Sequence, residues 1–348
     1  MAAFTHFSRK LLLNSLKLDV RPQINNKCMI CVRLLSYSPK EYDGNPDPGP
    51  IFMKNEVQHL LKTLTRIDLA KVFRKRKLGN KQLEQPTYKF MTDAQLEEAL
   101  NEVKKKVDKI IQIPPVVSVR KPINRILSRD SALQGLDTSN FVFTDVTFGV
   151  HNSERIIVVR DTNGTLKEAD WELRDRINQI YFPVKHRSIK IPKMFQESYF
   201  ENVLNKREYV FILDRACLQF EPNDALYQKI ISITYQHIND NNEFDVLRST
   251  RHFGSFAFFL AWHKMIDNLL LDLIETEHID EANALIELYS QIHKVKLQSD
   301  GNLRLLEEYI KNFSNKQGAL ELALQAYKNT VKQREELEAG IKKAHGHS

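Results

Sequence analysis

The chain of 348 residues carries 51 Lys and Arg against 44 Asp and Glu, which gives a formal net charge of +7. Its most apolar run, Phe253 to Trp262, is too short to cross a membrane, since a spanning helix needs roughly twenty apolar residues. Three cysteines are too few for a disulfide scaffold. Composition therefore excludes an integral membrane protein and a cysteine-rich secreted domain.

Residues 1–35 have the composition of a mitochondrial transit peptide, because they hold six basic residues against the single acid Asp19 and a leucine-rich apolar side. Arg33 stands three residues ahead of Ser36, so we predict that a matrix protease cuts between Leu35 and Ser36. An ordinary basic N-terminal arm is the alternative, and a secretory signal is disfavoured because no long apolar core follows the charges.

Removal of this leader changes the charge and the cysteine count. The net charge falls from +7 to +2, because six basic residues and one acidic residue are lost. A nearly neutral protein is a poor candidate for wrapping RNA without sequence preference, which requires surplus Lys and Arg. Cys28 and Cys31 also leave, so Cys217 remains alone and can form neither an intrachain disulfide nor a cysteine-based metal site.

The N-terminal part of the mature chain is predicted to be flexible first and helical afterwards. Residues 36–52 are rich in Pro, Gly, Asp and Ser and predict a flexible start. Apolar residues then recur with helical spacing over 54–73, with a break near Asp68. Thr92 and Gln95 form a capping box that opens a further helix, which ends before the prolines at 114 and 115.

Residues 140–183 predict an antiparallel β-meander followed by a helix. Runs of Phe, Val, Ile and Thr lie on both sides of residues 151–153, and Asn163-Gly164 suits a tight hairpin turn. Asp170 can cap the helix that Pro183 ends. Its predicted apolar face consists of Leu173, Ile177, Ile180 and Tyr181.

From about Phe195 the pattern becomes one helix after another, without a fixed repeat period. We predict an α+β protein: a small antiparallel β-meander with an N-terminal helical segment (53–193) and a C-terminal irregular, solenoid-like α-helical array (194–348) whose last helix is polar. The expected helices of the array are 209–220, 225–238, 250–277, 280–293, 303–313 and 318–343.

No catalytic, cofactor or metal site can be assembled from the sequence. The glycines form no phosphate loop, the histidines form no HExxH pair, and no serine lies in a GxSxG motif. Cys217 lies in an apolar helix and is interpreted as a small buried hydrophobe. We expect neither an enzyme nor a small-molecule substrate.

Three stretches together, residues 86–100, 140–183 and 244–254, resemble a mitochondrion-specific family of small-subunit ribosomal proteins, number twenty-two in that series. The resemblance implies a non-catalytic component of the mitochondrial small ribosomal subunit in the matrix, which supports subunit assembly and translation. Its partners would be neighbouring ribosomal proteins and, to a limited extent, small-subunit rRNA. A free mitochondrial RNA-binding factor is the alternative, and an enzyme of unrecognised type comes third.

Short basic segments are the candidate rRNA-phosphate contacts, since peripheral ribosomal proteins hold phosphates with such segments; plain solvation is the alternative. No aromatic and basic RNA-recognition signature accompanies the strands, so Phe141, Phe143 and Phe148 are interpreted as core. The candidate contacts are Arg74, Lys75, Arg76, Lys77, Arg120, Lys121, Lys185 and Arg187.

A candidate partner surface lies on the helix expected around residue 256. Apolar side chains cover all sides of this helix, which is typical of a buried helix. Either the array itself buries it or a neighbouring subunit covers part of it. The residues are Phe253, Phe256, Phe258, Phe259 and Trp262.

Overall fold

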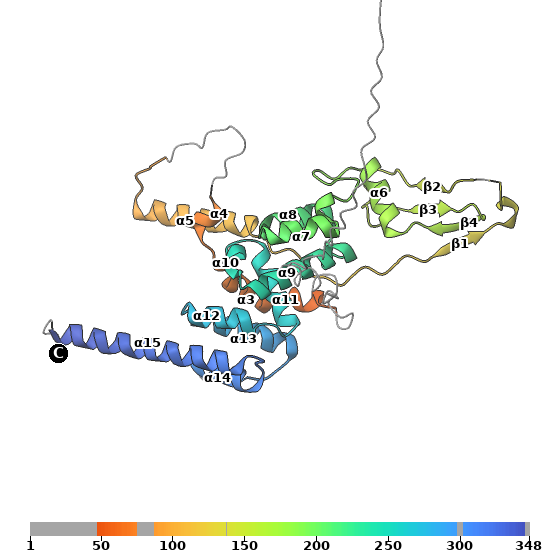
Figure 1. Ribbon diagram of the computed structural model, residues 1–348. Coiled ribbons are helices and arrows are strands. Elements are labelled where there is room, and N and C mark those ends of the chain that lie inside the picture. Colours follow the sequence, from red (N-terminus) through yellow and green to blue (C-terminus); the bar gives the residue numbers. More distant parts are fainter. Residues whose placement is uncertain (1–46, 75–86, 137, 298–301, 345–348) are drawn as a thin grey trace, which may run out of the picture. The chain divides into compact units, whose positions relative to one another are not determined.

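The structure is a computed structural model that describes residues 47–74, 87–136, 138–297 and 302–344. These residues form helices and one small antiparallel sheet, so the predicted α+β class is confirmed (Figure 1). The predicted transit peptide, the processing site at Arg33, Leu35 and Ser36, and the basic residues Lys75, Arg76 and Lys77 lie outside the described residues.

The N-terminal part contains helices α2 (Gly49–Phe52), α3 (Asn55–Thr65), α4 (Leu69–Val72) and α5 (Asp93–Ile110). The predicted flexible stretch, residues 36–52, is wrong for its last four residues. Residues 49–52 form α2, and the buried Phe52 ring meets the ring of Phe258 edge to face, with centroids 5.2 Å apart. The apolar Ile51 and Phe52 join the core, which outweighs the loop-forming tendency of the prolines around them.

Local capping signals place the helix boundaries correctly. The predicted break falls between α3, which ends with Arg66 in the left-handed conformation, and α4, which begins where the Asp68 carboxylate accepts a hydrogen bond from the backbone N–H of Ala70. Thr92 and Gln95 form the predicted capping box at the start of α5. Both signals act within four residues, so they operate independently of tertiary packing.

The sheet contains β1 (Ile126–Arg129), β2 (Phe141–Thr144), β3 (Ile157–Arg160) and β4 (Thr165–Glu168) in the antiparallel order β1-β4-β3-β2 (Figure 1). The predicted meander of β2, β3 and β4 is confirmed, whereas β1 was not predicted. Gly164 has a φ of 79°, and a Cβ there would lie 2.0 Å from the carbonyl oxygen of Asp130. Only glycine fits this turn.

Helix α6 (Trp171–Tyr181) covers one face of the sheet. Leu173 and Ile177 pack on the buried Ile157 and Val159, as the predicted apolar face requires. Ile180 and Tyr181 do not belong to this face, because about half of each side chain is exposed. The helix therefore uses a narrower apolar stripe than the sequence predicts.

The interpretation of Phe141, Phe143 and Phe148 as core is also wrong. Phe141 and Phe143 are about half exposed, and Phe148 is 95% exposed. The register pairs Phe143 with Val158 and Phe141 with Arg160, so both rings lie on the face opposite Ile157 and Val159. α6 packs on the other face, which leaves these rings without the cover that a core position requires.

The C-terminal array consists of α-helices joined by short turns. The predicted helix over 250–277 is divided into α11 and α12, because Lys264 takes a φ of 57° and turns the chain. The two short helices α7 and α10 were not predicted. The array contains α7 (Glu197–Asn205), α8 (Tyr209–Gln219), α9 (Ala225–Asn241), α10 (Phe244–Leu247), α11 (His252–Trp262), α12 (Asp267–Glu275), α13 (Ile279–His293), α14 (Asn302–Asn312) and α15 (Gln317–Ala344).

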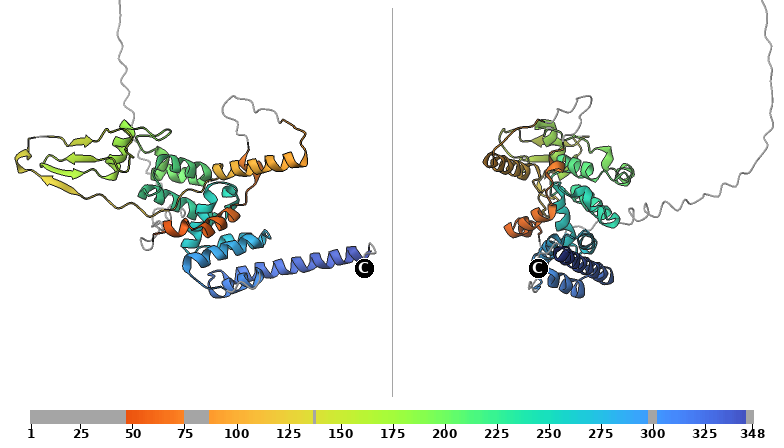
Figure 2. Two further views of the ribbon diagram at one scale, coloured as in Figure 1. Left: turned by 180° about the vertical axis from the view of Figure 1, so that it is seen from behind. Right: turned by 90° about the vertical axis from the view of Figure 1, so that its left-hand side faces the viewer.

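One continuous apolar core runs through the array and includes the N-terminal helix α3. α3 packs against both α11 and α13, although roughly two hundred residues separate these segments along the chain. α15 packs along α12 and α14 (Figure 2). The core of the C-terminal array is therefore completed by α3, a helix from the N-terminal part of the chain.

Candidate functional site

A polar cleft of about 320 Å³ lies between α6 with the loop before β3 and the turn that joins α8 to α9. Two of the predicted rRNA contacts, Arg120 and Arg187, are among its lining residues. Most of its lining residues carry polar or charged side chains. The lining residues include His151, Asn152, Ser153, Trp171, Arg174, Asp175, Asn178, Gln179, Glu221 and Asn223.

Arg120 links α6 to α9 across this cleft. Its guanidinium donates to the carboxylates of Asp175 in α6 and Asp224 at the start of α9, at 2.7 and 2.8 Å. The same guanidinium lies 4.6 Å from the ring centroid of Trp171. Only 11% of the Arg120 side chain is exposed. Asp224 also caps α9 by accepting from the backbone N–H of Leu226, so one carboxylate fixes both the helix end and the arginine.

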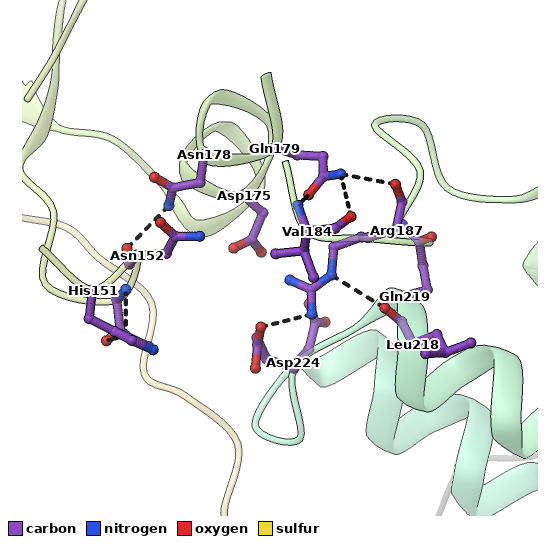
Figure 3. A network of polar contacts seen from close by, with 12 residues as sticks. His151, Asn152, Asp175, Asn178, Gln179, Val184, Arg187, Leu218, Gln219 and Asp224 are labelled. Atoms are coloured by element: carbon purple, nitrogen blue, oxygen red, sulfur yellow. Dashed lines mark hydrogen bonds and ion pairs between the residues drawn. The ribbon is translucent and has the colours of Figure 1, made fainter. Parts of the chain in front are cut away.

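Arg187 forms a second link between the two parts. Its guanidinium donates to the Glu221 carboxylate at 2.8 Å and to the carbonyl oxygen of Leu218. The side-chain amide of Gln179 donates to the carbonyl oxygens of Val184 and Arg187, as Figure 3 shows. These contacts hold the segment after α6 against the end of α8.

The side chain of Gln219 continues this contact. It accepts from the backbone N–H of Ser188 and donates to the carbonyl oxygen of the same residue, at 3.0 and 2.8 Å. One buried side-chain amide thereby pairs with both backbone groups of Ser188. This double pairing fixes which residue of the segment after α6 lies against the end of α8.

The floor of the cleft is formed by buried side chains of α6. Arg174 donates to the carbonyl oxygens of Arg155 and Ser153. Asn178 donates to the carbonyl oxygen of Asn152 (Figure 3). Arg155 in turn binds the carbonyl oxygens of Asp145, Thr147 and Val150. These side chains order the loop between β2 and β3.

The charges of the cleft neutralise one another. Burial raises the pKa of Asp175, while the hydrogen bond and the charge of Arg120 act in the opposite direction. Arg120 meets two carboxylates and Arg187 meets one. The described part of the chain holds no group of three or more His, Cys, Asp or Glu that could bind a metal ion. The ion pairs of the cleft therefore join α6 and the segment after it to the region of α8 and α9.

The structure gives two of the predicted rRNA contacts a different use. The guanidinium groups of Arg120 and Arg187 are occupied by carboxylates of the chain itself, which argues against phosphate binding by either residue. Lys121, next to Arg120, and Lys185, two residues before Arg187, are exposed beside the cleft. Arg74 is exposed as well.

The predicted partner surface is also corrected. Phe253, Phe256, Phe258 and Phe259 are fully buried in the chain's own core, and Trp262 is half buried and stacks on Phe258. The array buries this helix, which was one of the two alternatives, because α3, α9 and α13 pack around it. The four phenylalanine rings are therefore not available to a partner.

Cys217 packs against the core and lies 3.3 Å from the hydroxyl of Tyr227. Burial raises the pKa of its thiol, so the thiolate that a nucleophile requires is disfavoured. This agrees with the interpretation of Cys217 as a small apolar residue.

The acidic partners in the cleft were missed by sequence reasoning. Asp175 and Asp224 lie 55 and 104 residues from Arg120 along the chain. Asp224 offered one signal, since an Asp followed by an apolar helical pattern is a typical N-cap. Nothing in the local pattern around Asp175 or Glu221 distinguishes them from solvated surface acids.

No helix of the described residues has the length and apolarity that a membrane crossing requires.

Comparison with known proteins gives a family match over most of the described chain. Residues 50–294 match the family model described as mitochondrial 28S ribosomal protein S22. This match covers more than half of the chain and includes the sheet, α6, the cleft and the array up to α13.

Two relatives, both named small ribosomal subunit protein mS22, are similar to this chain over most of their length. The protein from Mus musculus is 38% identical over 306 residues, which cover 86% of this chain and 84% of the relative. The protein from Bos taurus is 39% identical over 285 residues, which cover 80% and 79%. Together with the family model, these matches show that the chain belongs to the mitochondrial 28S ribosomal protein S22 family.

Proposed function

We propose that this chain is a structural component of the small subunit of the mitochondrial ribosome, located in the matrix, where it supports subunit assembly and mitochondrial translation. The observation that carries the proposal is the family match over residues 50–294, together with relatives that are similar over about four fifths of the chain or more. Its partners are other proteins of the small subunit and, to a limited extent, the small-subunit rRNA.

A non-catalytic role agrees with the way the polar groups of the cleft are used. Arg120, Arg187 and Gln219 each bind groups of the chain itself and join α6 and its following segment to α8 and α9. Residues that hold two parts of a protein together in this way serve its architecture. We therefore propose that the chain is neither an enzyme nor a receptor for a small-molecule substrate.

Sedimentation of mitochondrial extracts through a sucrose gradient tests the proposal. The chain is expected to migrate with the small subunit and to remain there after washing at moderate salt. A free RNA-binding factor, the second candidate function, would stay near the top of the gradient. That outcome would refute the structural role.

Contact with rRNA is proposed for the exposed residues Arg74, Lys121 and Lys185, with Lys75, Arg76 and Lys77 next to Arg74 in sequence. Their support is exposure and charge, and the family's place in a ribosome. Each lost phosphate contact lowers the slope of log affinity against log salt by roughly 0.7–0.9. Alanine at Lys121 and Lys185 should therefore flatten the salt dependence of binding to small-subunit rRNA, whereas alanine at the occupied Arg187 should leave that slope unchanged.

Import and maturation complete the proposal. The basic, acid-poor residues 1–35 would direct the chain to the matrix, and cleavage between Leu35 and Ser36 would give the mature protein. N-terminal sequencing of protein from purified mitochondria tests this step. A mature N-terminus at or within a few residues of Ser36 supports it, and an intact Met1 contradicts it.

A further inference from the structure

Exposed apolar side chains cover the N-terminal half of α5 and the segment that leads into it. Tyr88 is 91% exposed and Phe90 is fully exposed. Met91, Leu96 and Leu100 are each between two fifths and half exposed. We call these five residues the α5 strip. Monomeric proteins rarely leave a contiguous apolar patch of this kind in water, and such patches mark interaction sites.

The same face of α5 is covered at its other end. Leu96, Leu100, Val103 and Val107 recur every three or four residues and therefore lie on one side of the helix. Val107 is buried, and the neighbouring Asp108 forms an ion pair with Lys62 of α3 at 3.6 Å. The array thus covers the stripe at Val107, whereas its N-terminal continuation is exposed; Ile110, at the C-terminal end of α5, is also half exposed.

The exposed half of α5 is already shaped as a helix. The capping box of Thr92 and Gln95 fixes its first turn, so the apolar side chains are presented at regular spacing. In Figures 1 and 2 this end of α5 extends past the neighbouring described helices. Most of the stability of a helix in a protein comes from packing of its apolar face, which favours a state in which a partner covers the stripe.

The charge around the α5 strip selects the kind of partner. Residues 87–100, which contain the α5 strip, hold three acids, Asp93, Glu97 and Glu98, against the single base Lys89, and the lysines at 104–106 follow beyond the strip. From the helical spacing, Asp93 and Glu97 flank one side of the exposed apolar stripe, whereas Glu102 lies toward the back of α5 and pairs with Lys106 at 3.8 Å. Phosphates would be repelled by these carboxylates, whereas Lys and Arg would be attracted.

We propose that the α5 strip binds a basic, apolar segment of a neighbouring protein of the small subunit, with apolar side chains against Leu96 and Leu100 and with Lys or Arg facing Asp93 and Glu97. The inference rests on the proposed function and names the kind of partner that the chain meets there. It places protein contact at α5, in contrast to the rRNA contact proposed for Lys121 and Lys185.

Site-specific photo-crosslinking in assembled small subunits identifies the occupant. A benzophenone amino acid is placed at Phe90 or Leu100 of the full chain, and the control position is the exposed Lys105, which lies on the opposite side of α5. The expected product from Phe90 and Leu100 joins the chain to one peptide of another protein that contains several Lys or Arg among apolar residues. Crosslinks to rRNA, to a second copy, to another segment of this chain, or no more than at Lys105, would overturn the inference.

A pair of matched charge reversals tests the electrostatic part. Glu97→Lys changes a residue beside the stripe, and Glu98→Lys makes the same change on the back of the same helical turn. Glu97→Lys should lower incorporation into the small subunit roughly fivefold in competition with the unchanged chain, and Glu98→Lys should not. Both side chains are exposed, so the two isolated proteins should unfold at the same temperature.

The outcomes separate this inference from the proposed function. If the unchanged chain sediments with the small subunit and both variants incorporate equally, the inference fails and the ribosomal role stands. If the unchanged chain stays at the top of the gradient, the ribosomal role fails, and the inference, which names a partner within the small subunit, fails with it.

Discussion

Arg66 and Glu281, 215 positions apart in the sequence, form a two-pronged ion pair, with nitrogen–oxygen distances of 2.6 and 2.8 Å. Glu281 also accepts a hydrogen bond from the buried Arg248 at 3.0 Å. One carboxylate thereby joins the end of α3, the end of α10 and the first turn of α13.

Replacing Glu281 by Gln should strongly destabilise the isolated protein. The change leaves the Arg248 guanidinium buried without its ion-pair partner, and breaking a buried pair in this way costs about 3–5 kcal/mol. Urea unfolding measures the loss. Glu336→Gln removes an exposed pairing with Lys332 and should cost less than about 1 kcal/mol; equal losses for the two variants would contradict the structural role of Glu281.

Arg120→Lys should loosen the contact between α6 and α9. Lysine keeps the charge but cannot reach two carboxylates and the Trp171 ring at once, so we expect a loss of about 1–3 kcal/mol in the free energy of unfolding. Hydrogen exchange should increase in residues 171–188. If Arg120 instead served rRNA, the variant would unfold normally and would only reduce RNA affinity.

Phe256→Ala should destabilise the isolated chain by about 3–5 kcal/mol, because a fully buried ring leaves a cavity. Phe148→Ala is the matched control, since that ring is 95% exposed. Thermal unfolding distinguishes the two variants. A partner-facing role for Phe256 would predict the opposite pattern, in which the isolated variant is stable and only its assembly fails.

Acid should weaken the fold through its buried histidines. Burial lowers the pKa of His252, His237 and His293 from the ordinary value of 6.5. The unfolded chain therefore binds protons that the folded chain does not, so stability is fully present above about pH 6.5 and falls as the pH drops below it. Urea unfolding from pH 7.5 to 5 measures this slope.

The contribution of one histidine can be isolated. His252 lies buried with its Nε2 atom 2.8 Å from a carboxylate oxygen of Asp214. His252→Gln should reduce the dependence of unfolding on pH, and His59→Gln, at an exposed position, should leave it unchanged. An unaltered slope in the His252 variant would show that other groups carry the acid sensitivity.

Local signals in the sequence predicted local structure well. The capping box at Thr92, the cap at Asp170 and the turn at Gly164 each depend on groups within a few residues, and each is present. The break between α11 and α12 was not predictable in this way. It occurs at Lys264 in a left-handed conformation, without a glycine or proline to announce it.

Long-range relationships account for the other errors. The alternation around Phe141 and Phe143 correctly indicated a strand, but only the position of α6 decides which face of the sheet is covered. The basic residues Arg120 and Arg187 were correctly singled out as charged clusters, yet their partners come from distant helices. Charge in a sequence identifies a residue that needs a partner, and the tertiary fold supplies that partner.

The packing of α3 on α11 and α13 also bears on the kinetics of folding. Helical arrays whose units touch only their neighbours can nucleate anywhere and grow unit by unit. Here α3 has its docking surface only after α13 has been delivered, so a large loop must close before the core is complete, and loop closure slows folding. A chain that enters a compartment with its N-terminus first would present α3 early and would hold its apolar stripe exposed until the last third of the polypeptide arrived. Chaperone binding during that interval is therefore expected at residues 57–64.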